Sequence, residues 1–331
     1  MLKLQSASAD AAFYFSMEEY LLRHFSGEEP LLMLWRTGPC VMLGASQIAA
    51  AELDLELAER LGLALVRRPS GGGAIFTDAG VLQISLISAP DERPGLRERA
   101  FESLAGLLLE ALTSLGFPVR LEGRNDILLG NGKCAGLAQH IWRKRICTHG
   151  SILYQADISA MSRVLRADEA KIASKGVRSL RARVANLADF PASPWTMDQF
   201  QAALSSFLGE RLRPRLFVPD AEALAVVEGI RREKYAHPDW TIGRSPPFTL
   251  RNSRRFPAGR LEVFLDVRKG RLLSCALRGD FLGLAPIREL ELELEGRPYT
   301  PEALRAALSG LDLGLFLGDI AQDQLLACLF P

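Results

Sequence analysis

Residues 67–80 form the stretch whose residue types most directly indicate binding chemistry. They read Arg-Arg-Pro-Ser-Gly-Gly-Gly-Ala-Ile-Phe-Thr-Asp-Ala-Gly, and they lie between short apolar runs at 63–66 and 81–87 that are typical of buried strands. Three successive glycines are tolerated where the chain needs a positive φ or where a ligand approaches the main chain closely. Behind two arginines, such a loop offers N–H groups and positive charge to a phosphate or carboxylate. The alternative is a glycine-rich hairpin with two solvated arginines.

Two common nucleotide-binding motifs do not describe this glycine loop. The chain has no Gly-x-x-x-x-Gly-Lys-Ser/Thr motif. The run Gly71-Gly72-Gly73 also lacks the Gly-x-Gly-x-x-Gly spacing that opens a long helix. We therefore expect a ligand at this position to be held by a loop between two strands.

A second group of polar residues lies in a stretch that reads as strand, turn, strand, loop and strand, from 123 to 154. Lys133 follows an Asn-Gly turn and precedes small residues, so its amine can stabilise negative charge on a phosphate or a carbonyl oxygen. Alone, such a lysine is more often a solvated turn residue. Asp126 can orient Lys133, hold a metal ion on phosphates or cap a turn. His149 is either an acid–base group or a structural histidine.

The remaining candidates have equally plain structural explanations. The arginines between 178 and 183 can cover a phosphate-bearing ligand, or they form a solvated face. Cys134 and Cys147 are candidate nucleophiles or small core residues. His24, His140 and His237 show no ligand spacing, and a His-Glu-x-x-His motif is absent, so the sequence argues against a protein-bound zinc site.

The composition indicates an ordinary globular enzyme. The 331 residues are 48% hydrophobic and 24% charged, with a formal net charge of +1, so no overall field favours nucleic acid or an anionic membrane. The five cysteines are odd in number and widely spaced, which fits reduced thiols in a cytosol. Signal-peptide and membrane-span patterns are absent from the sequence, so we expect a cytoplasmic protein.

Apolar periodicity and turn residues predict the order of the elements. Helical spacing predicts helices over 8–25, 50–61, 97–115, 157–166, 197–209, 220–235, 301–309 and 319–329. Apolar runs predict hairpins of 31–35 with 40–44 and of 260–267 with 271–277. Proline and polar residues over 239–248 predict a linker between a large domain at 1–238 and a small α+β domain at 249–331.

The order of these motifs resembles the lipoate–protein ligase A family. The matching residues are Arg67 to Phe76 with Asp78 and Gly80, then Gly123 to Asp126, Gly132-Lys133 with Gly136 and Ala138, His149-Gly150, and 175–187. The resemblance covers the whole chain, because residues from about Trp240 on look like the family's C-terminal accessory domain. It implies an α+β fold like that of biotin and lipoate ligases, with mixed and antiparallel sheets flanked by helices in the large catalytic domain.

The resemblance also implies an activity. It is an ATP-dependent ligation that converts lipoate or octanoate to acyl-AMP, with Mg²⁺ on the nucleotide phosphates and Asp126 as a candidate ligand of the ion. The acyl group then passes to a lysine of a lipoyl-carrier protein, either a lipoyl domain of a 2-oxoacid dehydrogenase complex or a protein like the glycine-cleavage H protein. We expect the enzyme to act as a monomer.

The same resemblance implies roles for individual residues. The lysine that matches Lys133 contacts the carboxyl and phosphate oxygens of the adenylate and is the catalytic residue. The residues implied to bind ATP and lipoyl-AMP are Arg68, Ser70, Gly71, Gly72, Gly73, Ala74, Ile75, Phe76, Asp126, Lys133, His149 and Gly150. Those implied to cover the adenylate from a loop are Lys175, Arg178, Arg181 and Arg183.

Two alternatives stay open at this point. One is an octanoyl- or lipoyl-transferase that uses a cysteine thioester without ATP; the cysteine of those enzymes lies beyond the strand after His149, where this chain has none until Cys275. The other is a degenerate ligase that only binds its carrier. It is suggested by Ala45 and Thr77, which are two of four departures from the family pattern: Arg, Asn, His and Asn are usual where this chain has Ala45, Ile48, Thr77 and Val81.

Overall fold

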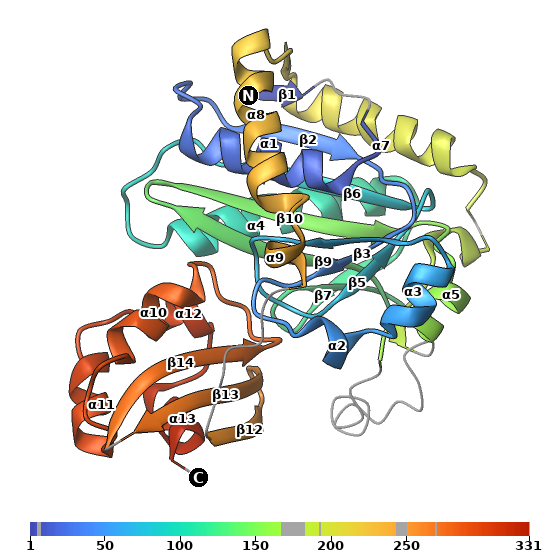
Figure 1. Cartoon of the computed structure of the whole chain (residues 1–331). Helices are drawn as coiled ribbons and strands as arrows, with labels where there is room; N and C mark the ends of the chain where they lie inside the picture. Colours follow the sequence, from blue (N-terminus) through green and yellow to red (C-terminus); the bar gives the residue numbers. More distant parts are fainter. Residues whose placement is uncertain (5–7, 167–182, 192, 243–249, 269, 331) are drawn as a thin grey trace.

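The computed structural model describes residues 1–4, 8–166, 183–191, 193–242, 250–268 and 270–330 (Figure 1). A larger part runs from the N-terminus to residue 242, and a smaller part, drawn in orange and red, begins at residue 250. Each part has its own sheets, helices and hydrophobic core. Within the described ranges no helix is both long enough and apolar enough to cross a membrane.

A mixed sheet of eight strands forms the centre of the larger part. The strands are β1 Leu2–Leu4, β2 Leu31–Trp35, β6 Val81–Ile87, β7 Val119–Glu122, β8 Asp126–Leu129, β9 Gly132–Trp142, β10 Arg145–Leu153 and β11 Arg215–Phe217. Their order is β11-β1-β2-β6-β10-β9-β8-β7. β1 pairs in parallel with β2 and β11, and the other neighbours are antiparallel. The predicted run of strand, turn, strand, loop and strand is confirmed as β8, β9 and β10.

A second sheet of three strands carries the glycine loop. It contains β3 Cys40–Leu43 between β4 Ala64–Arg67 and β5 Ile75–Thr77. The glycines lie between β4 and β5, so the predicted loop between strands is confirmed. The predicted hairpin of 31–35 with 40–44 is wrong, because β2 pairs with β1 and β6 on its two edges while β3 belongs to the second sheet. The Gly-Pro turn between them marks a change of direction, not a pairing.

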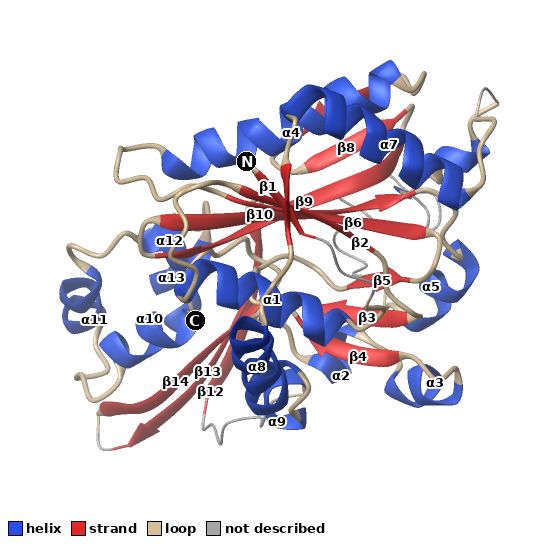
Figure 2. Ribbon diagram, turned by 90° about the horizontal axis from the view of Figure 1, so that it is seen from above, coloured by secondary structure: helices blue, strands red, loops and turns tan. Residues whose placement is uncertain are grey.

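Helices cover both faces of the large sheet (Figure 2). They are α1 Ala11–Arg23, α2 Ala49–Glu52, α3 Leu55–Arg60, α4 Leu96–Ser114, α5 Ile158–Val164, α7 Met197–Leu212, α8 Ala221–Ile230 and α9 Pro238–Thr241. A short 3-10 turn, Leu187–Asp189, precedes α7, and a π-helical turn, Arg231–Tyr235, continues α8. The pair α4 and α7 lies on one face, and α1 with α8 lies on the other. The central strands β6 and β10 are therefore buried on both sides, whereas the edge strands β7 and β11 are largely exposed.

One predicted helix, 50–61, is wrong as a single element. The structure has α2 and α3 instead, separated by Leu53 in an extended conformation. Asp54 starts the second helix, because its side chain accepts a hydrogen bond from the Leu57 N–H at 2.9 Å. The other predicted helices of the larger part are confirmed as α1, α4, α5, α7 and α8.

The smaller part is an α+β unit. Its sheet has the strands β12 Leu250–Phe256, β13 Gly259–Arg268 and β14 Arg271–Gly279, and its helices are α10 Ile287–Leu294, α11 Pro301–Leu308, α12 Leu313–Leu317 and α13 Gln322–Leu329. The predicted hairpin is confirmed as β13 and β14, and the two predicted helices as α11 and α13. Strand β12 escaped prediction because it is an exposed edge strand and lacks apolar alternation.

Candidate active site

A cavity of about 810 Å³ lies between the two parts of the chain, and both parts contribute to its wall. The smaller part contributes the end of β12 with the turn into β13, including Phe256, and two residues just after β14, Asp280 and Leu282. From the larger part the wall includes most of the residues proposed from the sequence: Arg68, Gly71, Gly72, Gly73, Ala74, Ile75, Phe76, Asp126, Lys133, His149, Gly150 and Arg183. Segments far apart in the sequence therefore meet at one site.

Four of the proposed residues need separate comment. The Ser70 side chain is buried behind the wall, where its hydroxyl contacts His149. Lys175, Arg178 and Arg181 lie outside the described residues. Whether any of the proposed residues binds ATP or an acyl adenylate stays a prediction.

Lys133 lies at the start of β9 with its ammonium group beside a carboxylate. Its Nζ is 2.7 Å from Oδ1 of Asp126 on the neighbouring strand β8, and the two side chains are only 31% and 19% exposed. A glycine makes room for this amine, because a Cβ atom at Gly136 would lie 2.5 Å from Lys133 Nζ. The short turn and the glycine together direct the lysine along the cavity wall. A partly desolvated ammonium group in this position can bind phosphate or carboxylate oxygens.

The two arginines before the glycine loop are buried and hold the protein's own backbone. Arg68 donates from Nη2 to the carbonyl oxygens of Gly71 at 2.7 Å and Gly73 at 2.8 Å, and from Nε to Ser70 Oγ at 3.1 Å. Burial, with a smaller contribution from neighbouring Arg67, lowers the pKa of Arg68 to about 10, so the group remains charged at neutral pH. It fixes the conformation of the loop from behind.

Arg67 connects three segments of the larger part. Its Nη1 donates to the carbonyl oxygens of Gly44 at 2.8 Å and Gln47 at 2.6 Å, and its Nη2 donates to Thr241 at 2.8 Å. In return, the indole N–H of Trp240 donates to the Arg67 carbonyl oxygen at 2.8 Å. Helix α9 is therefore attached to the segment that carries the glycine loop.

The N–H groups of the glycine loop face the smaller part. Gly71 donates to the carbonyl oxygen of Gly283 at 3.4 Å, and Gly72 donates to that of Phe281 at 3.1 Å. A Cβ atom at Gly71 would lie 2.4 Å from the Phe281 oxygen, and Gly72 has a φ of +93°. The sequence indicated a close approach to this backbone, and here the approaching group is the C-terminal part of the same chain. These two donors are not directed at an anion in this arrangement.

The apolar end of the cavity contains aromatic side chains and one buried histidine. Phe15, Trp35 and Met42 line this end, and His149 lies beside them. The His149 ring is hydrogen-bonded on both sides: Nδ1 lies 3.0 Å from Oε2 of Glu18, and Nε2 lies 2.6 Å from Ser70 Oγ.

Glu18 is fully buried in this arrangement. Its burial acts to raise the pKa of the carboxyl group, but the attraction of His149, its hydrogen bonds and the attraction of nearby His140 outweigh burial and hold the pKa far below its usual value. The carboxylate therefore accepts, and His149 Nδ1 carries the hydrogen.

Glu18 was not predicted as a site residue, and His140 was set aside because its spacing in the sequence does not match a metal-binding motif. Glu18 belongs to the predicted first helix, where its charge suggested the solvent-facing side. The structure buries it completely on the face that also carries Phe15 and Leu22. Those two residues stand three positions before and four after Glu18, which is the spacing of one helix face. The signal available in the sequence was a carboxylate, Glu18, on the same helix face as the apolar residues Phe15 and Leu22.

All five cysteines of the chain are described, reduced and buried. None of them lines the cavity described above. Burial is the largest influence on Cys134 and raises the pKa of its thiol to about 12, and burial likewise raises the pKa of Cys147 well above its usual value. Thiols with raised pKa values and no access to the cavity are poor nucleophiles.

Solved structures resemble the chain over most of its length, and one of them covers both parts. Lipoate-bound LipL1 of Plasmodium falciparum superposes with a TM-score of 0.79 over 94% of each chain, at 22% sequence identity. A bipartite lipoate protein ligase of Thermoplasma acidophilum, described together with its E2 lipoyl domain, gives 0.65 at 26% identity and covers 75% of this chain and 98% of that one. A lipoate-protein ligase A bound with ATP gives 0.63 at 25% identity, over 73% and 98% of the two chains. The fold is therefore the α+β fold of lipoate ligases, as expected.

Family models and curated relatives agree with the structural match. The model for the lipoyl protein ligase A/B catalytic domain covers residues 10–209, and the one for the bacterial lipoate protein ligase C-terminus covers 245–329. Lipoate-protein ligase LplJ of Bacillus subtilis is 32% identical over 97% of both chains, and lipoate–protein ligase 1 of Staphylococcus aureus is 31% identical over 96% of both. The chain belongs to the lipoate–protein ligase family.

Proposed function

We propose that this chain is an ATP-dependent lipoate–protein ligase. It activates lipoate, or octanoate, as the acyl adenylate and transfers the acyl group to one lysine of a lipoyl-carrier domain. The observation that carries the proposal is that one cavity of about 810 Å³ combines in its wall the glycine loop, the Lys133 hairpin and an apolar end. An acyl adenylate has the same three regions: a nucleotide, a charged anhydride and an apolar chain.

The first step needs charge neutralisation more than a protein nucleophile. A carboxylate oxygen of the acid attacks the α-phosphorus of ATP, the bond to the β-phosphate oxygen breaks, and pyrophosphate leaves. Lys133 is suited to this step, because its ammonium group can bind the carboxylate and the α-phosphate oxygens and hold them in line. The apolar residues Phe15 and Trp35 suit the acyl chain, since removal of its surface from water favours binding.

Mg²⁺ fits the donor chemistry at the charged end of the cavity. Asp126 lines the wall and supplies carboxylate oxygens, which are the ligands that Mg²⁺ prefers. The ion on the phosphates would reduce their repulsion towards the incoming carboxylate.

The second step transfers the acyl group to a carrier lysine. Its amine nitrogen attacks the acyl carbonyl carbon, AMP leaves, and the nitrogen loses a proton. A solved relative with 26% identity is described together with an E2 lipoyl domain, which supports a lipoyl domain as the acceptor. A domain of a 2-oxoacid dehydrogenase complex or a protein like the glycine-cleavage H protein would supply this lysine.

Two assays on the purified protein test the proposal. Lipoate-dependent exchange of labelled pyrophosphate into ATP reports the adenylation, and the intact mass of a candidate lipoyl domain reports the transfer. We expect exchange that requires lipoate or octanoate, and a carrier heavier by one acyl group. Exchange without transfer to any tested carrier would restrict the proposal to adenylation. Silence with both acids would reject it and favour a degenerate ligase.

The competing proposal is a transferase that forms a thioester on cysteine. The burial of Cys134 and Cys147, their raised pKa values and their absence from the cavity wall argue against it. Cys134→Ala should retain acyl transfer. Loss of transfer in this variant, with its fold intact, would favour the thioester route.

A further inference from the structure

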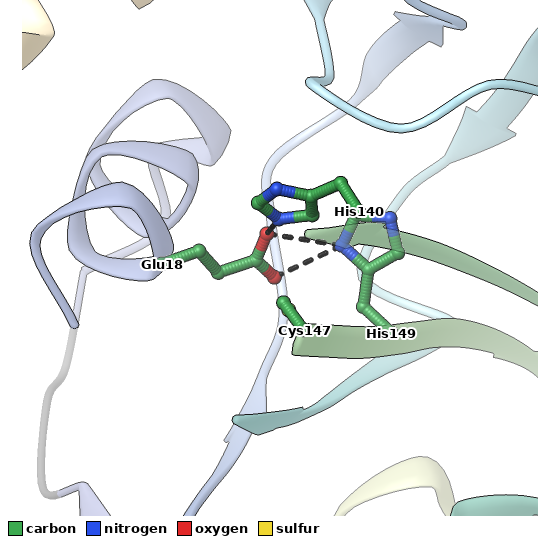
Figure 3. Close-up of side chains that lie close together, drawn as sticks. All are labelled: Glu18, His140, Cys147 and His149. Carbon is green, nitrogen blue, oxygen red and sulfur yellow. Dashed lines mark hydrogen bonds and ion pairs between the residues drawn. The ribbon is translucent and has the colours of Figure 1, made fainter. Parts of the chain in front are cut away.

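We propose that Glu18, His140, Cys147 and His149 form a binding site for a zinc ion. The four side chains are buried, and one ligand atom of each lies within 4.8 Å of those of the other three (Figure 3). His149 also lines the cavity described above, but zinc binding to this cluster requires neither ATP nor an acyl group, so it can be measured apart from the proposed ligase reaction.

Strand pairing explains how the ligands meet. Cys147 and His149 are two residues apart on β10, so their side chains lie on the same face of the sheet. His140 on β9 is directly opposite Cys147 in the antiparallel pairing and shares that face. Glu18 reaches the three from α1, which covers this face. The spacing in sequence gives no hint of the site, because the ligands come from three separate elements.

The donor set suits zinc. Zn²⁺ takes imidazole nitrogen, thiolate sulfur and carboxylate oxygen in tetrahedral geometry, and bond lengths of about 2.0–2.3 Å place its ligand atoms roughly 3.3–3.8 Å apart. The ligand atoms lie within 4.8 Å of one another, so the most widely separated of them would need to approach by about 1 Å. A mixed set with sulfur and two imidazoles is a poor match for Mg²⁺ or Ca²⁺, which prefer oxygen.

One atom of the cluster points to a missing partner. His140 Nε2 is buried and, among the described residues, has no hydrogen bond of good geometry. His140 Nε2 lies 3.5 Å from Oε2 of Glu18, so it faces another ligand atom of the cluster. A buried polar atom without a partner is unfavourable, and a bond to a metal ion would satisfy it.

Hydrogen bonds on the outer side orient the other ligands. Ser70 Oγ lies 2.6 Å from Nε2 of His149, and Ser85 Oγ donates to Oε1 of Glu18 at 2.6 Å. These contacts leave His149 Nδ1 and Glu18 Oε2 facing the centre. Metal-binding histidines and carboxylates are commonly fixed in this way by a second layer of hydrogen bonds.

The charges also balance. A carboxylate on Glu18 and a thiolate on Cys147 neutralise a divalent cation, while the two imidazoles remain neutral ligands, so the filled site carries no net charge in a buried place. On binding, the Cys147 S–H bond is replaced by a sulfur–zinc bond and that proton passes to solvent. The ring hydrogen of His149 moves from Nδ1 to Nε2, where Ser70 Oγ lies 2.6 Å away and can accept it, so that the Nδ1 lone pair is free to bind zinc.

The test measures zinc retained by untagged protein. After incubation with a small excess of zinc and gel filtration, we expect one zinc ion per chain by mass spectrometry of the metal. Cys147→Val and His140→Asn should each retain less than about a tenth of that amount, because each removes one ligand of four. Cys40→Val is the matched control: Cys40 is a buried cysteine in the same core cluster, and its loss should leave the zinc content unchanged.

Two further measurements distinguish the loss of a zinc ligand from the loss of the fold. Circular dichroism identifies variants that have lost the fold, and cobalt substitution of the wild type should give a thiolate-to-cobalt absorption band that Cys147→Val lacks. Wild-type protein that retains no zinc would overturn the proposal. Equal zinc in the wild type and in folded Cys147→Val and His140→Asn would overturn it as well. Neither result bears on lipoate-dependent exchange, so the site and the ligase proposal fail separately.

Discussion

Two walls of the cavity differ in what their charged and polar groups contact. In the loop wall, formed by the glycine loop, these groups contact the protein itself. In the hairpin wall, formed by β8 and β9, they remain partly exposed to the cavity. Arg68 is fully engaged with loop carbonyls and Ser70, and the Gly71 N–H faces Gly283. Lys133 and Asp126 instead form one ion pair along the wall. The comparison suggests that the glycine loop maintains the shape of the site and that the hairpin supplies its reactive charge.

The comparison predicts its largest effect at Lys133. Lys133→Ala should lower lipoate-dependent ATP–pyrophosphate exchange by about 10²–10³-fold, the usual cost of removing one positioned group that stabilises charge in a transition state. The free energy of unfolding should change little, since the residue is partly exposed. Lys144→Ala is the control, because Lys144 is a surface lysine that pairs with Glu92. A loss of less than about threefold would assign the chemistry to another group.

The glycine-loop wall predicts a large effect on stability at Arg67. Arg67→Met should lower the free energy of unfolding by about 3 kcal/mol, because several buried carbonyl groups lose their donor. Urea unfolding followed by circular dichroism measures this change. Arg120→Met removes an exposed arginine and should stay within about 0.5 kcal/mol of the wild type. Equal stability of both variants would mean that Arg67 does not hold the loop.

The contact between the loop and the smaller part predicts a moderate effect. Gly71→Ala should destabilise the protein by about 1–3 kcal/mol, since the new Cβ atom would lie 2.4 Å from the Phe281 carbonyl oxygen and force a backbone shift. Gly106→Ala provides the matched control, because Gly106 is exposed in α4 and has open space around it. That substitution should stabilise by up to about 1 kcal/mol. Similar shifts in both variants would show that the contact is weak or absent in solution.

The sequence predicted the hairpin wall better than the loop wall. Lys133 is positioned by a local turn and by its neighbour Gly136, and both lie within a few residues in the sequence. Most strands and helices were predicted for the same reason, since their apolar periodicity is local. The family resemblance added the correct fold, which no local pattern contains.

The remaining features depend on pairings between distant segments. The partners of Arg67 include Thr241, 174 positions away, so its burial could not be inferred from a run of charged and glycine residues. The same holds for His140, which meets Glu18 only when α1 lies over β9 and β10. The Gly71 contact with Gly283 requires the smaller part to lie against the loop. Local sequence indicated that these residues are special without indicating their partners.

The smallest expected effect separates two roles of Asp126 on the hairpin wall. If its carboxylate only orients Lys133, Asp126→Asn should reduce exchange by about two- to fivefold at every Mg²⁺ concentration, since a partly exposed ion pair contributes little. Because we propose that Asp126 also holds Mg²⁺, we expect a larger loss at low Mg²⁺ that shrinks as Mg²⁺ is raised. Exchange rates across a Mg²⁺ titration measure this directly.

Glu122→Gln is the control for that titration, because Glu122 lines the same cavity but pairs with Arg120. It removes one negative charge, as Asp126→Asn does, and should leave the Mg²⁺ dependence unchanged. A Mg²⁺-dependent loss in both variants would reflect the general charge of the cavity, because the two carboxylates would then be interchangeable. A loss independent of Mg²⁺ in Asp126→Asn would leave this residue with the orienting role alone, and the reactive charge of the hairpin wall would reduce to Lys133.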